Sequence, residues 1–293
     1  MNLLLTVTEI VAPVFLLAAV GFLWVRFGNE YRVQFVTQLT MTLSVPCLIF
    51  TALMKTEIEP QALTALSLAA AAAYGAVTIL CLTVVRLARL DRRTYLSPII
   101  FGNTGNIGLP LALFAFGERG FDYAVVVFAV MAIYSFTFGV WLVAGGGSPL
   151  KALKEPLVWA TALGGLFLWQ GWQTPAFLTN ALTLIGQIAV PLMLITMGVA
   201  IARLHPGHLP RAVWLSLVKL AICLGVAAGI GLWFGLDRVA LAVLVLQIST
   251  PVAVTSYLLA EKYGADADAV AGLVVVSTLL SMLALPLTLA VLL

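Results

Sequence analysis

Long apolar runs, separated by short polar segments, extend along the whole chain. The hydrocarbon core of a bilayer requires about 20 consecutive apolar residues per helix. Ten runs of about this length are present, at residues 5–25, 34–54, 62–85, 95–116, 122–144, 156–172, 176–202, 211–235, 239–260 and 269–292. Nearly all charged residues lie in the segments between them. The pattern predicts an all-α polytopic membrane protein with ten transmembrane helices.

The composition excludes several other classes of protein. Hydrophobic residues make up 62% of the 293 positions and charged residues 9%, whereas a soluble domain carries about 25% charged residues. Too few polar side chains are available to cover a water-facing surface, which excludes a soluble enzyme, a disordered chain and a nucleic-acid-binding protein. A porin-type barrel is excluded because its strands would alternate apolar and polar residues. We therefore expect a lipid bilayer, and no nucleic acid, as a partner of this chain.

The distribution of lysine and arginine predicts the orientation in the membrane, since cytoplasmic loops carry an excess of these residues. Segments on the opposite side hold Lys55, Arg119 and Arg238. The richer side holds eleven: Arg26, Arg32, Arg86, Arg89, Arg92, Arg93, Lys151, Lys154, Arg203, Arg211 and Lys262. The richer side is predicted to be cytoplasmic. Both termini then face outward, toward the periplasm if the membrane is the inner membrane of a bacterium.

The two halves of the chain resemble each other weakly at an offset of 145 residues. Phe22-Leu23-Trp24 recurs as Phe167-Leu168-Trp169, and Val45-Pro46 recurs as Val190-Pro191. Chance matches between apolar segments are the alternative, but two matches at one offset favour duplication. Each half, 1–150 and 151–293, holds five predicted spans. Because five is odd, two copies in series have opposite orientations, which is the inverted-repeat plan of many secondary transporters.

The fourth span contains the sequence Phe-Gly-Asn-Thr-Gly-Asn-Ile-Gly-Leu-Pro at residues 101–110. Glycine costs about 1 kcal/mol and proline about 3 kcal/mol relative to alanine in a helix interior. Non-helical backbone persists at membrane depth only where it is buried in protein or lines a wet cavity. The sequence predicts a broken helix, with half-helices near 95–103 and 109–116 and a break near the middle of the bilayer.

A break of this kind offers a binding site for an anion. A half-helix that starts near Gly108 directs free N–H groups and the positive end of its dipole into the gap. Neutral hydrogen-bonding side chains lie beside it. A packing kink made by small residues is the alternative, but two asparagines are unnecessary for packing. The candidate binding residues in this span are Asn103, Thr104, Gly105, Asn106, Gly108 and Pro110.

The ninth span, which the repeat pairs with the fourth, also has polar residues and a proline near its middle. It contains no glycine in this stretch, and Ser and Thr can hydrogen-bond to their own helix. A second break and a mild proline kink therefore both remain open at this point. The candidate binding residues here are Gln247, Ser249, Thr250, Pro251 and Thr255.

Lys219 is the one charged residue well inside a span, about 12 Å into the eighth helix. One interpretation is that Lys219 places a positive charge beside an anion, or in the position of a coupling cation. The other is that its side chain extends to the membrane interface. No carboxylate is placed at the midplane, so an anionic substrate is favoured. His205 and His208 are interpreted as solvated loop residues, and Cys47, Cys81 and Cys223 as apolar packing residues. We expect no metal site and no cofactor.

These residues resemble the auxin efflux carrier family, which includes the plant PIN carriers and bacterial malonate or malate permease-like proteins. Asn103-Thr104 with Gly108-Leu109-Pro110-Leu111 resembles the fourth-helix motif of the family, and Ser44-Val45-Pro46 matches its second-helix turn. Pro251 and the segments 260–263 and 284–289 follow the last two helices of the plant carriers. Two features differ: the plant carriers have a second proline where this chain has Ser256, and their long cytoplasmic loop is reduced to about residues 145–155.

The resemblance implies ten helices in two inverted five-helix repeats, as in the bile-acid symporter and sodium/proton antiporter superfamily. Helices one, two, six and seven would form a scaffold, and helices three to five and eight to ten a transport unit. Broken helices four and nine would cross. Asn103 and the Gly108–Pro110 break, together with Pro251 and its neighbours, would then line the site, and the turn at Pro46 would face it.

The sequence therefore predicts a secondary transporter, and not an enzyme, that moves a small organic anion by elevator-type alternating access. One alternative is a sodium-coupled symporter of the bile-acid type, and another is a membrane sensor that binds the anion without moving it. A homodimer is one assembly that the sequence allows. A membrane enzyme is disfavoured because no nucleophile–base pair or metal-ligand motif is recognisable.

Overall fold

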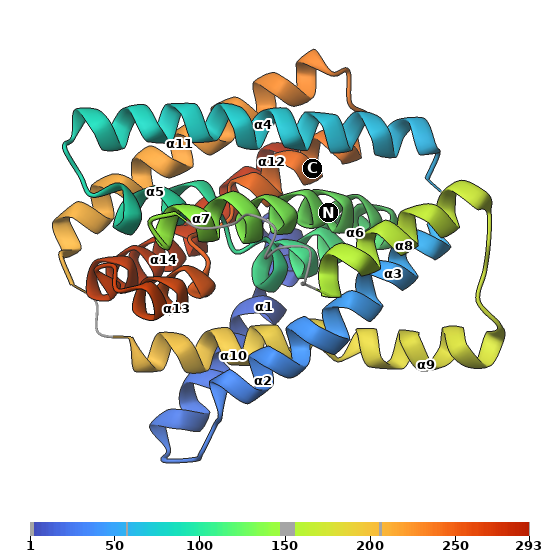
Figure 1. Cartoon of the computed structure of the whole chain (residues 1–293), viewed down its shortest axis with the longest axis horizontal. Helices are drawn as coiled ribbons and strands as arrows, with labels where there is room; N and C mark the ends of the chain where they lie inside the picture. Colours follow the sequence, from blue (N-terminus) through green and yellow to red (C-terminus); the bar gives the residue numbers. More distant parts are fainter. Residues whose placement is uncertain (1–2, 57, 147–155, 205–206, 293) are drawn as a thin grey trace.

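The computed structural model describes residues 3–56, 58–146, 156–204 and 207–292, and its elements are helical (Figure 1). Lys151, Lys154 and His205, which entered the sequence analysis, lie outside these described residues, as does the expected boundary between residues 150 and 151. The helices are α1 (Leu3–Arg26), α2 (Val33–Leu39), α3 (Val45–Lys55), α4 (Pro60–Leu87), α5 (Arg92–Ile100), α6 (Leu109–Tyr134), α7 (Val140–Val143), α8 (Pro156–Gln170), α9 (Ala176–Gln187), α10 (Ala189–Arg203), α11 (Leu209–Trp233), α12 (Arg238–Ile248), α13 (Val254–Tyr263) and α14 (Ala267–Leu292). Three π-helical turns interrupt this series: η1 (Thr40–Ser44), η2 (Thr104–Gly108) and η3 (Ser135–Gly139).

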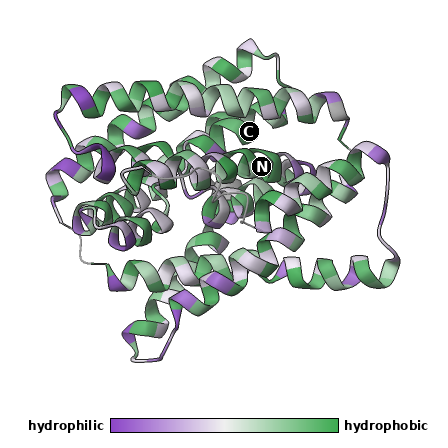
Figure 2. Ribbon diagram, viewed as in Figure 1, coloured by the Kyte–Doolittle hydropathy of each residue, from purple (hydrophilic) through white to green (hydrophobic). Residues whose placement is uncertain are grey.

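Seven helical segments of the described chain are long and apolar enough to cross a membrane, which makes this a multi-pass membrane protein. Their apolar surfaces cover most of each helix, and hydrophilic residues gather mainly at helix ends and turns (Figure 2). The segments are Glu9–Arg26, Val33–Lys55, Gln61–Leu87, Thr104–Val143, Ala176–Arg203, Leu209–Trp233 and Ala267–Leu292. The fourth and ninth predicted spans are interrupted helices, and the sixth corresponds to the 15-residue helix α8. Helix α6 is kinked at Gly117 (φ +64), between the fourth and fifth predicted spans.

The helices pack in two groups that touch along a shared face. In the first group α1 packs against α10, and α3 packs against α8 and α9. In the second, α11 packs against α4, α12 and α14, while α6 packs against α4 and α12. In Figure 1, α4 and α11 run along one edge of the molecule, and α9 and α10 run along the opposite edge. The groups meet where α1 and α3 contact α6 and where α10 contacts η2.

Glycines allow α1 and α10 to approach closely. A Cβ atom added at Gly198 would overlap the Ala18 carbonyl, and one added at Gly21 would overlap the Ile195 carbonyl. Small residues of this kind are typical of helix interfaces within membranes, where close backbone contact replaces the hydrophobic effect as the source of attraction. This pair therefore forms the tightest part of the first group.

Each interrupted helix starts with an aspartate N-cap. The Asp91 carboxylate accepts the Thr94 N–H at 2.9 Å at the start of α5, and the Asp237 carboxylate accepts the Val239 N–H at 2.9 Å at the start of α12. Burial alone would raise the pKa of both carboxyl groups, but the hydrogen bonds from hydroxyl and backbone N–H donors outweigh it and lower each pKa. The charged caps fix the first turns of both helices.

Candidate functional site

The first interruption lies between α5 and α6. α5 ends at Ile100, Phe101 is extended, and the Asn103 carbonyl accepts the N–H groups of Ile107 and Gly108 at 3.0 and 3.3 Å to begin η2. The predicted half-helix through residue 103 is wrong by three residues, because the non-helical segment is 101–103 and residues 104–108 form a π-helical turn. Pro110 supplies no N–H to the preceding turn, and the wider turn carries the chain into α6 without that bond.

The second interruption is a complete break and not a mild kink. Helix α12 ends at Ile248 and α13 begins at Val254, which leaves residues 249–253 outside both helices. The Thr250 hydroxyl donates to the Gln247 carbonyl at 2.7 Å, and the Ser249 hydroxyl donates to the Leu246 carbonyl at 3.2 Å. These hydroxyls satisfy carbonyl groups at the end of α12 that have lost their helical partners.

The two non-helical segments cross and pair with each other. Gly102 and Val252 form an antiparallel bridge, and the Asn103 N–H donates to the Pro251 carbonyl at 2.7 Å. The Val252 N–H donates to the Ser277 hydroxyl of α14 at 3.0 Å. Backbone groups of the crossing thus find partners within the protein, which is the condition for non-helical backbone at membrane depth.

Glycine is needed at the crossing because the chains approach so closely. A Cβ atom at Gly102 would overlap the Thr250 hydroxyl, and a Cβ atom at Gly108 would overlap the side-chain oxygen of Gln247. Gln247 is fully buried, and its Nε2 donates to the Ala124 carbonyl at 3.3 Å. Its Oε1 and the Thr104 hydroxyl are buried without a hydrogen-bond partner in the described structure. Two polar atoms at the crossing therefore remain available to a ligand or to water.

A small cavity of about 30 Å³ lies beside the crossing, between the two helix groups. Its lining residues come from α2, η1, η2, α10 and α13: Val33, Thr37, Thr40, Met41, Asn106, Met193, Thr196, Met197, Val254, Thr255 and Leu258. A space of this size holds about one or two water molecules, and an organic acid does not fit without movement of the walls. The lining is apolar with neutral polar groups and includes no carboxylate.

A wider vestibule of about 620 Å³ adjoins this cavity on the side that carries the basic loops. The two spaces share the lining residues Val33, Val254 and Leu258. The vestibule also contains Arg32 and Arg203, and the Arg203 guanidinium donates to the Tyr31 carbonyl at 2.7 Å. The Arg32 guanidinium is ion-paired with Glu30, which also lines the vestibule, at 2.6 Å. The two arginines and one glutamate leave a net positive charge in the lining, which favours the approach of an anion.

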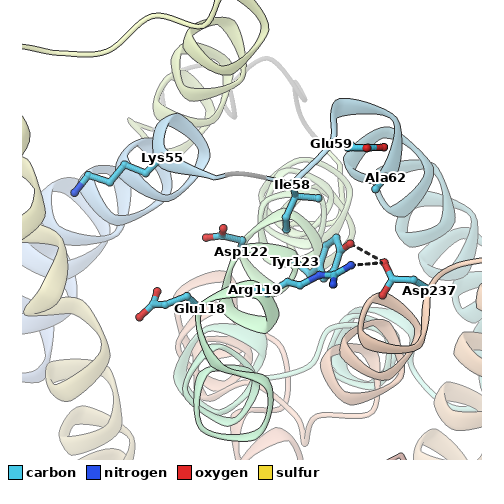
Figure 3. Close-up of a pocket in the computed structure, with 9 residues that line it drawn as sticks. All are labelled: Lys55, Ile58, Glu59, Ala62, Glu118, Arg119, Asp122, Tyr123 and Asp237. Atoms are coloured by element: carbon cyan, nitrogen blue, oxygen red, sulfur yellow. Dashed lines mark hydrogen bonds and ion pairs between the residues drawn. The ribbon is translucent and has the colours of Figure 1, made fainter.

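A separate cleft of about 820 Å³ opens on the opposite side of the molecule. Figure 3 shows Asp237 at the start of α12 facing Tyr123 and Arg119 of α6. The Tyr123 hydroxyl donates to the Asp237 carboxylate at 2.7 Å, and the Arg119 guanidinium lies 3.4 Å from the same oxygen. The cleft shares no lining residue with the small cavity. The crossing is thus closer to the vestibule with the basic loops.

The structure brings most of the predicted site residues together at the crossing. Of these residues, Asn106 and Thr255 line the small cavity directly. Pro46 is buried at the start of α3 and does not line the cavity. The remaining ones are buried in or next to the crossing: Asn103, Thr104, Gly105, Gly108, Pro110, Gln247, Ser249, Thr250 and Pro251.

Sequence reasoning missed the residues that α10 contributes. The Asn103 amide donates to the Met197 sulfur at 3.2 Å, and Met193 and Thr196 also line the cavity. Their spacing of three and four positions places them on one helix face. Methionines are common in apolar segments, so this spacing resembles ordinary core packing. The signal in the sequence was therefore too weak to select them.

Lys219 is directed into the protein and does not extend to the interface. Its side chain is 3% exposed, and its ammonium group donates to the Thr250 carbonyl at 2.9 Å. The Cys223 sulfur lies 3.8 Å from the same nitrogen. Of the histidines, His208 lies 3.8 Å from the Asp266 carboxylate, close to a turn. No group of three potential metal ligands is present among the described residues.

The helical bundle, its apolar spans and its buried backbone crossing define a polytopic membrane protein of the transporter class. The model of the membrane transport protein family matches residues 6–151 and 146–289 of this chain. The chain belongs to this family, the auxin efflux carrier family, which confirms the resemblance seen at the fourth helix. Members of the family are transporters.

Three similar proteins support this membership. An uncharacterized transporter of Methanothermobacter thermautotrophicus is 27% identical over 295 residues, covering 96% of both chains. An uncharacterized transporter of Methanocaldococcus jannaschii is 24% identical over 308 residues, covering 95% of this chain and 96% of the relative. A Rhizobium meliloti protein named "Putative malonate transporter" is 25% identical over 197 residues, covering 62% of this chain and 61% of the relative.

Proposed function

We propose that this protein is a secondary transporter that moves a small carboxylate-bearing anion across the cytoplasmic membrane. The observation that carries the proposal is the crossing of two interrupted helices, with unpaired polar atoms and a small cavity beside it. Discontinuous helices of this kind form the substrate sites of many secondary transporters. The helix ends and side chains around the cavity would bind the carboxylate after the cavity widens.

The charges around the crossing favour an anion over a cation. The cavity has no carboxylate in its lining, while α13 starts at its wall with Val254 and Thr255. N–H groups at a helix start attract negative charge. The vestibule that adjoins the cavity is lined by Arg203 and by Arg32, which is paired with Glu30, so its lining has a net positive charge. The Rhizobium relative is named a putative malonate transporter, which supports a small dicarboxylate as the substrate.

The transporter would have ten spans arranged as two inverted repeats, residues 1–150 and 151–293. The N-caps Asp91 and Asp237 support this arrangement, since they begin the two interrupted helices and lie 146 positions apart (237 − 91). The helix groups support a scaffold of α1–α3 and α8–α10 and a transport unit of α4–α7 and α11–α14. Movement of the transport unit along the scaffold would carry the crossing between the two sides.

The orientation follows from the basic loops. The vestibule with Arg32 and Arg203 would face the cytoplasm, and both termini would face the opposite side of the inner membrane. The conformation would then be one in which the site is closed but lies nearer to the cytoplasmic opening.

Uptake of labelled malonate into proteoliposomes tests the function. The Asn103→Ala variant should lose uptake about 10- to 100-fold, because an amide that bonds to a charged ligand contributes about 1.5–3 kcal/mol. Asn180→Ala is the matched control, since Asn180 is exposed on α9, far from the crossing. Undiminished uptake by Asn103→Ala would remove the site assignment. Saturable binding of malonate without any flux in the wild type would instead favour a membrane sensor.

A further inference from the structure

Lys219 is the one lysine, arginine, aspartate or glutamate among the buried residues of the described structure. It projects from the middle of α11 toward the second interruption, and its ammonium group lies 2.9 Å from the Thr250 carbonyl oxygen. A buried ammonium group without a partner is strongly unfavourable, so this contact must compensate for the loss of water. The position of the charge is therefore tied to the crossing.

The end of α12 is a place where positive charge is favourable. Carbonyl groups at a helix C-terminus lack intrahelical partners, and the helix dipole places partial negative charge there. The hydroxyls of Ser249 and Thr250 satisfy the carbonyls of Leu246 and Gln247. The Thr250 carbonyl, which lies beyond the end of α12, accepts a hydrogen bond from the Lys219 ammonium group.

The groups around Lys219 include no carboxylate in the described structure. Its contacts are the Thr250 carbonyl and the Cys223 sulfur, and Ser216, one turn earlier on α11, is buried without a hydrogen-bond partner. The ammonium group is thus held by a carbonyl oxygen of an unwound helix and a neutral side chain, without a counter-ion. Unwound-helix carbonyls are also ligands of bound Na⁺ in transporters. Here a covalently attached ammonium group contacts such a carbonyl.

The corresponding position in the first half carries no charge. Tyr74 lies 145 positions before Lys219 (219 − 74), on α4, and its ring stacks on Phe101 with 6.3 Å between ring centres. The Tyr74 hydroxyl is buried without a partner in the described structure. The end of α5 is instead approached by the Cys81 thiol, 3.7 Å from the Ile99 carbonyl. The positive charge is thus specific to the second interruption.

We propose that the Lys219 ammonium group is a resident cation of the crossing and replaces a dissociable coupling cation such as Na⁺. The proposal rests on the proposed transport function and extends it in two ways. Transport does not require Na⁺, and the lysine side chain stays with the crossing throughout the transport cycle, which favours an anionic substrate. Lys219 is a positioning residue, because it acts on the substrate through the backbone at Thr250.

Replacing Na⁺ by choline in wild-type proteoliposomes is the first test and needs no variant. Malonate uptake and the melting temperature in detergent should both stay unchanged. Loss of uptake in choline, with recovery in Na⁺, would overturn the proposal. Absence of malonate uptake in both media would refute the proposed substrate. The melting temperatures would still show whether Na⁺ stabilises the protein, which the proposal excludes for the wild type.

Substitution of Lys219 is the second test. Lys219→Ala should lower uptake about tenfold or more, because a charge-assisted hydrogen bond is lost. Ethylammonium or Na⁺ should restore part of the uptake and raise the melting temperature of this variant, since either cation can enter the vacated space. Lys219→Arg retains a cationic side chain and should keep measurable uptake. This variant provides the test if Lys219→Ala does not fold. Lys262→Met, which removes an exposed lysine from α13, is the matched control.

Two results would contradict the role of Lys219. One is wild-type uptake by a folded Lys219→Ala protein in choline. The other is a Lys219→Ala protein that folds but gains neither uptake nor melting temperature from ethylammonium or Na⁺, while Lys219→Arg is equally inactive. A merely structural lysine would not produce a cation-dependent change in either measurement.

Discussion

In the first interrupted helix, glycines leave space for the other chain segment at the crossing. In the second, side chains donate hydrogen bonds to the carbonyl groups that the break exposes. Gly102 and Gly108 leave space for Thr250 and Gln247, and the second segment has no glycine between Ile248 and Val254. There, two hydroxyls and the Lys219 ammonium group bond to carbonyls that the helix no longer uses. The difference teaches that the two segments of such a crossing can have different roles. One supplies the side chains that hydrogen-bond to the exposed backbone, and the other supplies glycines that allow the close approach.

The largest effect is expected where space is lost. Gly102→Ala places a methyl group against the Thr250 hydroxyl and 3.0 Å from the Thr250 carbonyl, so the two segments must separate. Overpacking of this kind costs about 2 kcal/mol, and the Asn103–Pro251 hydrogen bond should weaken with it. Thermal unfolding in detergent measures the loss.

Gly225→Ala is the control for this substitution. Gly225 lies within α11, and no atom lies within 4 Å of an added Cβ. Alanine has a higher helix propensity than glycine, so this variant should be slightly stabilised. Equal stability of the two variants would show that the close approach at Gly102 is not required.

The threonine hydroxyls of the two segments should differ in how much each contributes to stability, by a smaller amount. Thr250→Val removes the donor to the Gln247 carbonyl and should cost about 1 kcal/mol. Thr104→Val removes a buried hydroxyl that has no partner in the described structure, so stability should be unchanged or slightly increased. Malonate uptake by the Thr104 variant should nevertheless fall if that hydroxyl binds the substrate. Equal destabilisation by both substitutions would contradict the assigned hydrogen bonding.

The sequence was sufficient for the class of protein but not for the details of the crossing. Apolar runs and the scarcity of charge predicted the membrane helices, because burial in lipid requires both. A break between residues 103 and 109 was predicted from glycine and proline. The observed non-helical segment, 101–103, lies a few residues earlier, where Asn103 pairs with Pro251, 148 positions away (251 − 103). Such long-range pairing leaves no local pattern.

The second half of the site shows the same limit. The choice between a kink and a break near Pro251 could not be made from local propensity, because Ser and Thr hydroxyls support either conformation. The orientation of Lys219 depended on the Thr250 carbonyl, which only the folded crossing places within its reach. The α10 residue Met197 contacts Asn103 for the same reason.

The two aspartate N-caps should respond alike to acid, although one begins α5 and the other begins α12. The pKa of Asp237 and that of Asp91 are both lowered in the folded protein. Their stabilising contribution is therefore present above the ordinary carboxyl pKa of about 3.9 and is lost as the pH falls through the lower folded value. Asp237→Asn retains the cap but not the charge, and should cost about 0.5 kcal/mol or less at neutral pH.

Melting temperatures of the wild type, Asp237→Asn and Asp91→Asn between pH 7 and pH 3 measure this contribution. Each difference from the wild type should shrink as the pH falls, because the wild-type carboxylate becomes protonated. A difference that grows toward low pH would mean that the carboxylates do not stabilise the helix starts.

The smallest effect is expected at Tyr74, 145 positions before Lys219 (219 − 74). Tyr74→Phe removes a buried hydroxyl without a partner in the described structure and keeps the ring on Phe101. The free energy of unfolding should be unchanged or rise by about 0.5 kcal/mol, since an unpaired polar group no longer has to be buried. Malonate uptake should stay at the wild-type level in Na⁺ and in choline. A loss of uptake in Tyr74→Phe comparable to that in Lys219→Ala would mean that both interruptions require a polar group behind them, and the asymmetry between them would no longer hold.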